Sequence, residues 1–334
     1  MTASTCATPD TAPGGPAKLR VLSSALKSPR VCAILLLVSL AITSLGSELA
    51  ARDVFPRISR IRQRIETEHQ AARRLKGDPQ RPAILVVGNS LVERGVDIDS
   101  LRTQLPEYKL ARFVVSDTSY FDWYYGVRRL FTEGARPQTL VLGLSARQLL
   151  TNRIEGNLSA NVLIRTADIH RVARDLNQDN TALSNLYLDN LSAFFGGSAQ
   201  FRKWLLASVL MPDLQNLAIA LSPPSRPLPP SSEIISIGAA RLRAISEVCR
   251  KNGVRFVLLV PPSPSAAEMQ VEALKQAGSL SGVDVLVPAE KEEFTADLFS
   301  DGLHLNRAGE GKFTLLLASS LKQRLSDRMN AKLF

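Results

Sequence analysis

Three residues that lie far apart in the chain have the types and local spacing of a nucleophilic catalytic group. Asp301 precedes His304 by three residues, and a D-x-x-H step on a loop can place the carboxylate beside imidazole Nδ1, so that Nε2 faces outward as a base. Ser90 follows Gly88 and Asn89 at the end of an apolar run, where a tight turn exposes a hydroxyl group. The order Ser, Asp, His therefore predicts a serine that attacks an acyl carbon with the help of a histidine base.

Each half of this pattern also has a structural explanation when it is taken alone. A Gly-Asn-Ser segment after a strand is common as a plain turn or a helix cap, and an Asp-x-x-His step also occurs in helix-capping loops. The two halves stand at opposite ends of one α/β region, and this combination favours the catalytic interpretation. Phosphate and dinucleotide binding are excluded, because GNSLVERG lacks the Lys-Ser/Thr of a P-loop and no G-x-G-x-x-G follows a strand.

The elements that must position these residues belong to an α/β domain over residues 81–334. Apolar runs typical of buried parallel strands alternate with helical periodicity, which predicts a three-layer α/β/α sandwich around a mostly parallel sheet. In such sheets ligands bind beyond the carboxyl ends of the strands. The strand-like runs are AILVVGNS (83–90), ARFVVS (111–116), TLVLGLS (139–145), VRFVLLV (254–260) and VDVLV (283–287).

The alternation stops over residues 151–232, which we expect to form a helical insertion or lid. This stretch is rich in Asn, Leu and Ala at helical spacing, and it closes with SPPSRPLPPSS, which is too stiff for a helix or a strand. His170, within the insertion, is expected to be a surface histidine. Two interpretations, core packing or a sugar subsite beside the active edge, stay open for the aromatic residues Tyr120, Trp123, Tyr124 and Tyr125.

The N-terminal region predicts an exported, membrane-anchored domain. Residues 31–47 contain no charge over 17 residues, the lower limit for crossing a hydrocarbon core about 30 Å thick. The preceding residues 1–30, expected to be a disordered cytoplasmic tail, carry four Lys or Arg and one acid, so the positive-inside rule places the domain in the periplasm or outside the cell. A cleaved signal peptide is the alternative, because Ser44-Leu45-Gly46 offers a small-x-small cleavage site.

A stalk is expected between the anchor and the domain, over residues 48–80. Apolar residues recur there at near-helical spacing among abundant charges, which predicts an amphipathic helix. Two roles stay open for it: a solvated spacer, or a helix whose basic face touches anionic head groups. His69 has polar neighbours in the sequence and is expected to be exposed.

Composition excludes several other classes of protein. The 334 residues include 45% hydrophobic residues, with 41 Lys and Arg against 31 Asp and Glu for a net charge of +10, which suits one globular domain with an extra segment. The basic charge is mostly diffuse and does not alternate with stacking aromatics, so no nucleic-acid partner is expected. The three Cys and three His form no close pairs, so we expect no metal and no cofactor. Cys249 is expected to be a buried apolar residue without a disulfide.

With these motifs in place, the sequence resembles the SGNH or GDSL-like serine hydrolases, particularly the membrane-anchored members associated with bacterial polysaccharide O-acetylation. The resemblance covers residues 82–322 apart from the insertion. It implies an SGNH-hydrolase-like fold and a Ser-His-Asp triad. The family's first block is matched by Gly88, Asn89 and Ser90, and its last block by Asp301 and His304.

The resemblance also implies an oxyanion hole, and here the sequence departs from the family in two places. The second block's glycine is missing from the segment SDTSY (116–120), and the third block's Gly-x-Asn aligns with Gly143-Leu144-Ser145, so that a serine hydroxyl replaces an amide. Losing one oxyanion donor costs about 10²- to 10³-fold in rate, which predicts weak or narrowly tuned activity. The implied donors are the Ser90 amide, the amide of Thr118 or Ser119, and the Ser145 hydroxyl.

What the resemblance implies for function is an esterase or O-acyltransferase that acts on acetyl or other acyl esters of an envelope or secreted polysaccharide. The implied partners are the acylated glycan, the membrane through residues 31–47, and a membrane protein that delivers acyl groups. A cationic surface is compatible with an acidic polymer. The alternative is a catalytically impaired module that binds glycan or scaffolds an acetylation complex.

Overall fold

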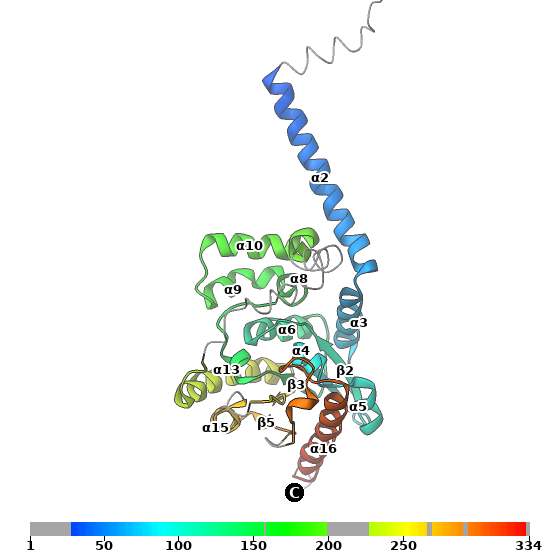
Figure 1. The fold of residues 1–334 in the computed structure, drawn as a ribbon, viewed down its shortest axis with the longest axis vertical. Coiled ribbons are helices and arrows are strands. Elements are labelled where there is room, and N and C mark those ends of the chain that lie inside the picture. Colours follow the sequence, from blue (N-terminus) through cyan, green and yellow to red (C-terminus); the bar gives the residue numbers. More distant parts are fainter. Residues whose placement is uncertain (1–27, 157, 199–226, 266–268, 290–292, 332–334) are drawn as a thin grey trace, which may run out of the picture. The chain divides into compact units, whose positions relative to one another are not determined.

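A computed structural model describes residues 28–156, 158–198, 227–265, 269–289 and 293–331. The chain divides into two compact units, Met1–Ala50 and Ala51–Phe334, and the second unit contains the whole sheet (Figure 1). Residues 199–226 lie outside the described part, and with them the predicted helical stretch FRKWLLASVL and the first five residues of the proline-rich segment 222–232. The end of that segment, Ser231 and Ser232, is helical, contrary to the prediction, because it begins a long helix, Ser231–Lys251.

A five-stranded, fully parallel sheet forms the centre of the second unit, with strand order β2-β1-β3-β4-β5. Every residue of β1 and β3 is buried, as expected for central strands covered on both faces. The strands are β1 (Ala83–Gly88), β2 (Lys109–Val114), β3 (Thr139–Gly143), β4 (Arg255–Leu259) and β5 (Asp284–Leu286).

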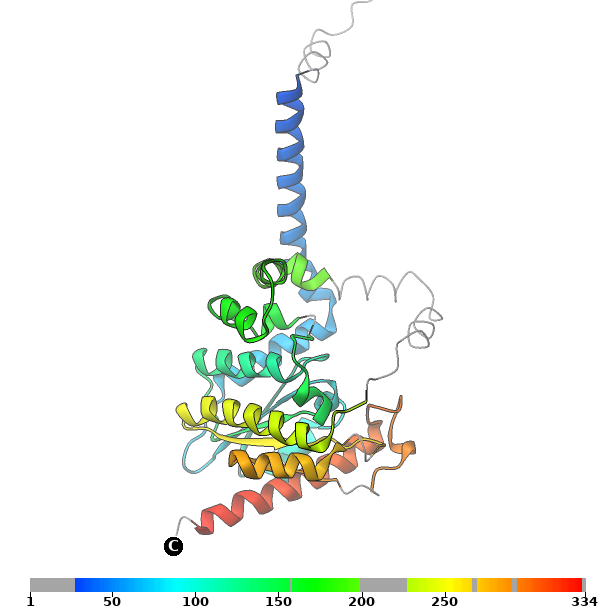
Figure 2. The same cartoon turned by 90° about the vertical axis from the view of Figure 1, so that its left-hand side faces the viewer.

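Helices cover both faces of this sheet, so the predicted three-layer α/β/α sandwich is confirmed. The two apolar cores lie on opposite faces, and Figures 1 and 2 show the long helices lying along the sheet. One face carries α3 (Arg60–Arg74), α6 (Tyr120–Thr132), α7 (Ala146–Leu150), α13 (Ser231–Lys251) and α15 (Val271–Ser281). The other carries α4 (Ser90–Glu93), α5 (Ile98–Gln104), the short 3₁₀ helix η2 (Ala296–Leu298) and α16 (Arg307–Ala331).

The predicted insertion is helical where the structure describes it. A small core of its own joins it to Tyr125 of α6, through apolar residues such as Ile169 and Val172. Figure 1 shows these helices gathered beside α6. They are α8 (Ser159–Val162), the 3₁₀ helix η1 (Thr166–Asp168), α9 (Ile169–Asp175) and α10 (Asn180–Leu191).

The predicted stalk over residues 48–80 requires a correction. Its helix α3 is no solvated spacer, because it packs along the edge strand β2 and buries Ile65, His69 and Ala72. His69, expected to be exposed, stacks on Phe113 with ring centroids 5.2 Å apart, and its Nε2–H donates to Glu133 Oε2 at 2.7 Å. Burial lowers the pKa of His69 and the Glu133 carboxylate only partly offsets this, so the imidazole is neutral.

Charged side chains hold α3 on the sheet edge, which explains why a helix so rich in charge is buried on one side. Glu68 Oε1 accepts hydrogen bonds from Nε and Nη2 of Arg112 at 3.2 and 2.9 Å. Glu68 Oε2 accepts from the Val114 backbone N–H at 2.9 Å, which satisfies an edge amide that would otherwise lack a strand partner. The amphipathic face of α3 therefore belongs to the domain.

One helix in the described part of the chain is long and apolar enough to cross a membrane. This segment, Pro29–Asp53, is the greater part of α2 (Pro29–Ile58). It includes the predicted residues 31–47, and the large apolar side chains of that stretch are exposed. A signal sequence near the N-terminus meets the same criterion of length and composition.

Candidate active site

Ser90, His304 and Asp301 form a continuous hydrogen-bonded chain, although 210 residues separate the serine from the carboxylate. His304 Nε2 lies 2.9 Å from Ser90 Oγ, and His304 Nδ1 lies 2.7 Å from Asp301 Oδ2. This order of contacts suits an imidazole that donates Nδ1–H to the carboxylate and accepts the serine O–H at Nε2. The chain can therefore pass the serine proton to the imidazole.

Asn89 fixes the turn that presents Ser90. It follows β1 directly, is buried, and caps the short helix α4 by accepting the Leu91 N–H at Oδ1, at 3.0 Å. Its Nδ2 donates to the Thr118 carbonyl at 2.9 Å, which ties the loop after β1 to the loop after β2. Ser90 is the first residue of α4, and its N–H has no hydrogen-bond partner among the described residues. That amide is free to bind an anion beside the serine oxygen.

Two glycines allow α4 to sit directly on the sheet. Gly88 and Gly143 are neighbours in the ladder between β1 and β3, at the carboxyl ends of both strands. A methyl group on either glycine would collide with the side chain of Val92. Gly143 therefore makes room for the helix that carries the nucleophile, a packing role that we did not predict for it.

Glu93, at the end of α4, is held from two further elements. Its carboxylate forms an ion pair with Arg64 of α3 and accepts a hydrogen bond from Ser116 Oγ at 2.8 Å. The Glu93 carbonyl accepts from Arg112 of β2 at 3.4 Å. All four residues are partly buried, so α3 and β2 together restrain the turn that bears Ser90.

A tight loop before α16 positions His304. An antiparallel bridge between Phe299 and Leu305 closes the loop, and Ser300 donates both its N–H and its hydroxyl to the His304 carbonyl. Gly302 has φ of 76°, a left-handed conformation that glycine adopts without strain. The imidazole is thus brought over the carboxyl edge of the sheet by local turn geometry.

The loop also keeps Asp301 ionised. Burial alone would raise the pKa of its carboxyl. The His304 N–H, the His304 ring and the Leu303 N–H all donate to it, and they lower the pKa to about 2. A carboxylate in this state can orient the imidazole and stabilise its charged form.

The loop after β2 corrects part of the predicted oxyanion hole. The Ser119 N–H donates to Asp122 Oδ2 at 2.8 Å and its hydroxyl donates to the same oxygen at 3.0 Å, so Ser119 caps α6 and has no donor left for a substrate. The Thr118 hydroxyl is also engaged, because it donates to the Val115 carbonyl at 2.6 Å and accepts from Trp123 Nε1 at 2.9 Å. The backbone amide of Thr118 is the remaining candidate from this loop.

Asp117, in the loop after β2, has an uncommon backbone conformation. Its φ of 59° is left-handed, a conformation that favours glycine and that Asp and Asn adopt more readily than other residues.

Ser145 leaves β3 at the same level at which Ser90 leaves β1, because Gly143 and Gly88 are paired in the sheet. Its Oγ accepts the Gln148 N–H at 3.3 Å as the cap of α7, and its own N–H donates to Gln148 Oε1 at 2.9 Å. Accepting this bond leaves the hydroxyl proton of Ser145 able to donate. Its place at the carboxyl edge of the sheet is compatible with the predicted role as a hydrogen-bond donor to the substrate.

The aromatic stripe of α6 packs mainly in the core. Trp123 and Tyr125 are fully buried, Tyr120 is 3% exposed, and only Tyr124 is partly accessible. The Tyr120 hydroxyl donates to the Arg241 carbonyl at 3.1 Å. Of the two interpretations left open by the sequence, core packing is the one that fits these three residues.

His170 was expected to be exposed and Cys249 to be buried, and the structure confirms both expectations. His170 is exposed and lies edge-on to Tyr187, with ring centroids 5.6 Å apart. Cys249 is fully buried in the core without a disulfide, and burial raises the pKa of its thiol to about 12. Neither is placed near the Ser90 turn by any described contact.

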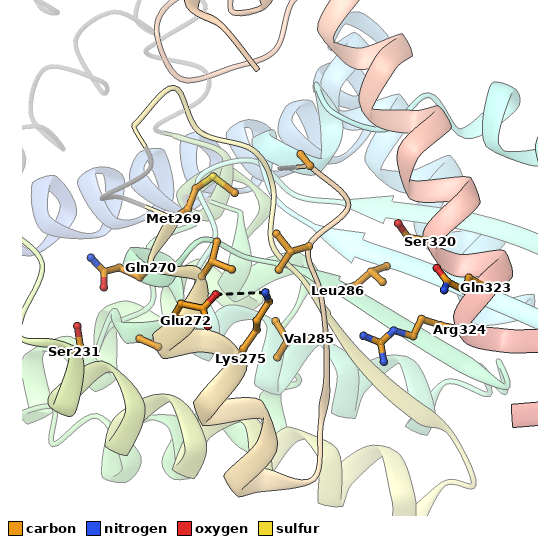
Figure 3. A pocket seen from close by; sticks show the side chains of 14 residues that line it. Ser231, Met269, Gln270, Glu272, Lys275, Val285, Leu286, Ser320, Gln323 and Arg324 are labelled. Atoms are coloured by element: carbon orange, nitrogen blue, oxygen red, sulfur yellow. Dashed lines mark hydrogen bonds and ion pairs between the residues drawn. The ribbon is translucent and has the colours of Figure 1, made fainter. Parts of the chain in front are cut away.

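A separate hollow of about 890 Å³ lies at the β5 edge of the sheet, between α15 and α16 (Figure 3). Figure 3 shows Glu272 and Lys275 of α15 pointing toward one another, 3.4 Å apart, with Arg324 across the opening on α16. Ser90, Asp301 and His304 are not among the described residues that line it. The candidate active site is the edge around Ser90, because a serine, a histidine and a carboxylate are joined by hydrogen bonds there.

No family model matches the chain, and no curated protein matches it. Among solved structures, the chain is similar to a GDSL-like lipase from Bacteroides thetaiotaomicron, at a TM-score of 0.32 and 11% identity over 80% of this chain and 97% of the lipase. It is also similar to the YxiM protein of Bacillus subtilis, at a TM-score of 0.38 and 11% identity over 73% of this chain and 57% of that protein. Similarity this weak assigns no activity.

Sequence reasoning missed three residues that build the site: Arg64, Glu93 and Asp122. The Ser119–Asp122 pair has the S-x-x-D spacing of a capping box, which could have shown that Ser119 is occupied. The Arg64–Glu93 pair joins helices that are distant in the sequence, and no local pattern indicates it.

Proposed function

We propose that this protein is a serine esterase or O-acyltransferase of the SGNH or GDSL-like type, with Ser90 as nucleophile, His304 as base and Asp301 as the orienting carboxylate. The observation that carries the proposal is the unbroken hydrogen-bonded chain from Ser90 Oγ through the imidazole to an ionised carboxylate. It lies at the carboxyl edge of a parallel sheet, where α/β proteins bind their ligands.

The mechanism follows from the geometry. Ser90 Oγ attacks the ester carbonyl carbon while its proton moves to His304 Nε2, and the imidazolium is stabilised by Asp301. The same proton then passes to the leaving alcohol as the carbon–oxygen bond breaks, which gives an acyl-serine. Water, or a sugar hydroxyl, attacks this ester next and gives its proton to His304, which returns it to Ser90. Water as acceptor makes an esterase, and a sugar hydroxyl makes an O-acyltransferase.

Three donors are proposed to hold the oxyanion. They are the Ser90 N–H, which has no described partner, the Thr118 N–H, and the Ser145 hydroxyl. Asp117 keeps the left-handed turn of the second loop, so its backbone shape suits an amide donor there. Because a rotatable hydroxyl replaces a fixed amide at position 145, we expect slower turnover than a complete oxyanion hole would support.

The substrate class is proposed from location and charge. If α2 anchors the chain and the four basic residues before residue 31 stay in the cytoplasm, the domain faces the periplasm or the exterior. Together with the resemblance to the SGNH family, this location favours acyl esters, above all acetyl esters, of an envelope or secreted polysaccharide as substrates. The net charge of +10 suits an acidic polymer.

The experiment that tests the proposal is active-site labelling of the full chain in detergent with a fluorophosphonate probe. We expect labelling of the wild type that is lost in Ser90→Ala and in His304→Ala, with Ser100→Ala as a matched serine control that labels normally. Ser100 lies on α5, outside the hydrogen-bonded chain. An unlabelled wild type would instead support a glycan-binding or scaffolding module, the function that an incomplete oxyanion hole favours.

Reaction type is settled by a second measurement on the same variants. Release of p-nitrophenol from its acetate is compared with and without an oligosaccharide acceptor, and the acetylated oligosaccharide is measured by mass spectrometry. A transferase should pass a larger share of acetyl groups to the sugar than the uncatalysed reaction does. Ser90→Ala should reduce the share to the uncatalysed level.

A further inference from the structure

An exposed apolar surface lies on the insertion, at the end of α10 and on the helical residues 193–198 that follow. The side chains of Leu188, Leu191, Phe194 and Phe195 are 48%, 59%, 44% and 50% exposed. The two phenylalanine rings lie edge to face, with centroids 5.6 Å apart. We refer to these four residues as the apolar tip. Exposed apolar side chains gathered on one segment are typical of protein-binding and membrane-binding surfaces.

A hydrogen bond joins the apolar tip to Arg52, which follows the uncharged run closely in the chain. Arg52 Nη2 donates to the Leu191 carbonyl at 3.1 Å, and both residues belong to the same compact unit. The uncharged run ends at Ser47, and at 1.5 Å per helical residue Arg52 lies only about 7 Å farther along α2. If α2 crosses a bilayer, Arg52 lies in the head-group layer, and so does the backbone of Leu191.

We propose that the apolar tip inserts into the surface of the lipid bilayer beside the anchor. Surface helices bury apolar residues about 5–10 Å deep at the boundary between head groups and acyl chains, which matches the depth that the Arg52 contact imposes. The exposed side chains of Arg57 and Arg60, which follow Arg52 in the chain, add positive charge that favours anionic head groups.

The consequence is a domain with two membrane attachments. A single helix leaves a domain free to swing about its tether, whereas a second contact on the insertion restricts its orientation. The Ser90 edge would then keep one preferred orientation relative to the bilayer. This inference goes beyond the proposed chemistry and depends only on α2 being in the membrane.

The test uses the full chain in vesicles of phosphatidylcholine and phosphatidylglycerol, with Cys6→Ser and Cys32→Ser to leave only the buried Cys249. Single cysteines at Phe195→Cys, Leu280→Cys and Leu40→Cys carry an environment-sensitive fluorophore. Leu280 on α15 is 58% exposed and serves as the matched apolar control, and Leu40 in α2 reports whether the anchor is inserted. Fluorescence is quenched either by doxyl groups on lipid chains or by aqueous iodide.

We expect doxyl lipids to quench the label at position 195 at least about threefold more strongly than the label at 280, and iodide to show the reverse order. Iodide quenching at 195 equal to that at 280 would overturn the proposal, because the tip would face water. Protection of 195 from both quenchers would also overturn it, because protein such as residues 199–226 would cover the tip. If the label at 40 is not quenched by doxyl lipids, α2 is not inserted and the proposal fails with it.

Discussion

At the scale of single residues, the proposed chemistry depends on one carboxylate that the loop before α16 keeps charged. Asp301 accepts three hydrogen bonds within four residues, two of them from backbone amides. Backbone donors cannot rotate away, so the carboxylate stays directed at His304 even though its side chain is 54% exposed. Local sequence is enough to build this part of the site.

This arrangement makes a prediction about stability and pH. The pKa of Asp301 is about 2 in the fold, against about 3.9 in an unfolded chain, so the ionised carboxylate stabilises the fold above about pH 4. The contribution is lost as pH falls from about 4 through about 2. Because the side chain is over half exposed, we expect about 1 kcal/mol or less. Urea unfolding of the wild type and Asp301→Asn at pH 2 to 6 measures it. If the free energies of unfolding of the two proteins differ as much at pH 2 as at pH 6, the prediction is contradicted.

A second residue-scale prediction concerns Glu93, which acts on Ser90 only through the position of α4. Glu93→Ala removes the contacts with Arg64 and Ser116, and we expect fluorophosphonate labelling of Ser90 to slow about tenfold or more, since small displacements of a nucleophile are costly. Ser116→Ala, which removes one of the two contacts, should slow it less. Labelling rates and thermal midpoints are measured together. A slower rate that parallels the loss of folded protein would show a purely structural role.

The three proposed catalytic residues could be predicted from sequence because each half of the pattern is local: a strand, a turn and a serine, then a carboxylate three residues before a histidine. The oxyanion donors could not be predicted as well. Whether a backbone amide is free depends on its acceptors in the fold, and Asp122 takes the amide of Ser119. A sequence pattern shows where a donor lies, and tertiary contacts decide whether it is available.

At the scale of elements, the strands could be predicted because burial on both faces demands continuous apolar runs, as in β1 and β3. The role of α3 could not. Its charged residues suggest a solvated helix, yet Glu68 and Arg112 bind each other across the edge of the sheet. Such pairing depends on which strand becomes the edge, and this is a property of the topology rather than of any local segment.

The contact between α4 and the sheet makes a prediction at this scale. Gly143→Ala should destabilise the domain by about 1–3 kcal/mol, because the added methyl group collides with Val92. In Gly143→Ala/Val92→Ala the collision is relieved, so the double variant should be more stable than the sum of the two single losses predicts. Denaturant midpoints of the four proteins give the coupling. Strict additivity would mean that the backbone shifts to accept the methyl group.

At the scale of the whole molecule, residues 51–334 form one compact unit that contains the sheet and the helices that cover it. The sequence alone suggests instead a domain that begins near residue 81. The difference is α3, which supplies Ile65, His69 and Ala72 to the core of one face and Glu68 to the edge strand. A chain that begins after α3 therefore lacks part of the core, and not only a linker.

Two truncated chains separate these boundaries. We expect the chain 51–334 to fold, and the chain 76–334 to lose about 4 kcal/mol or more, because it leaves Phe113 uncovered and Arg112 without its carboxylate. For a domain of this size that loss corresponds to a thermal midpoint about 10 °C lower. Glu68→Gln within 51–334 removes the ion pair but keeps the helix, so its thermal midpoint should lie between those of the two truncated chains. Equal midpoints for both truncated chains would show that α3 contributes nothing to the fold, and that Arg64 cannot restrain the turn that carries Ser90.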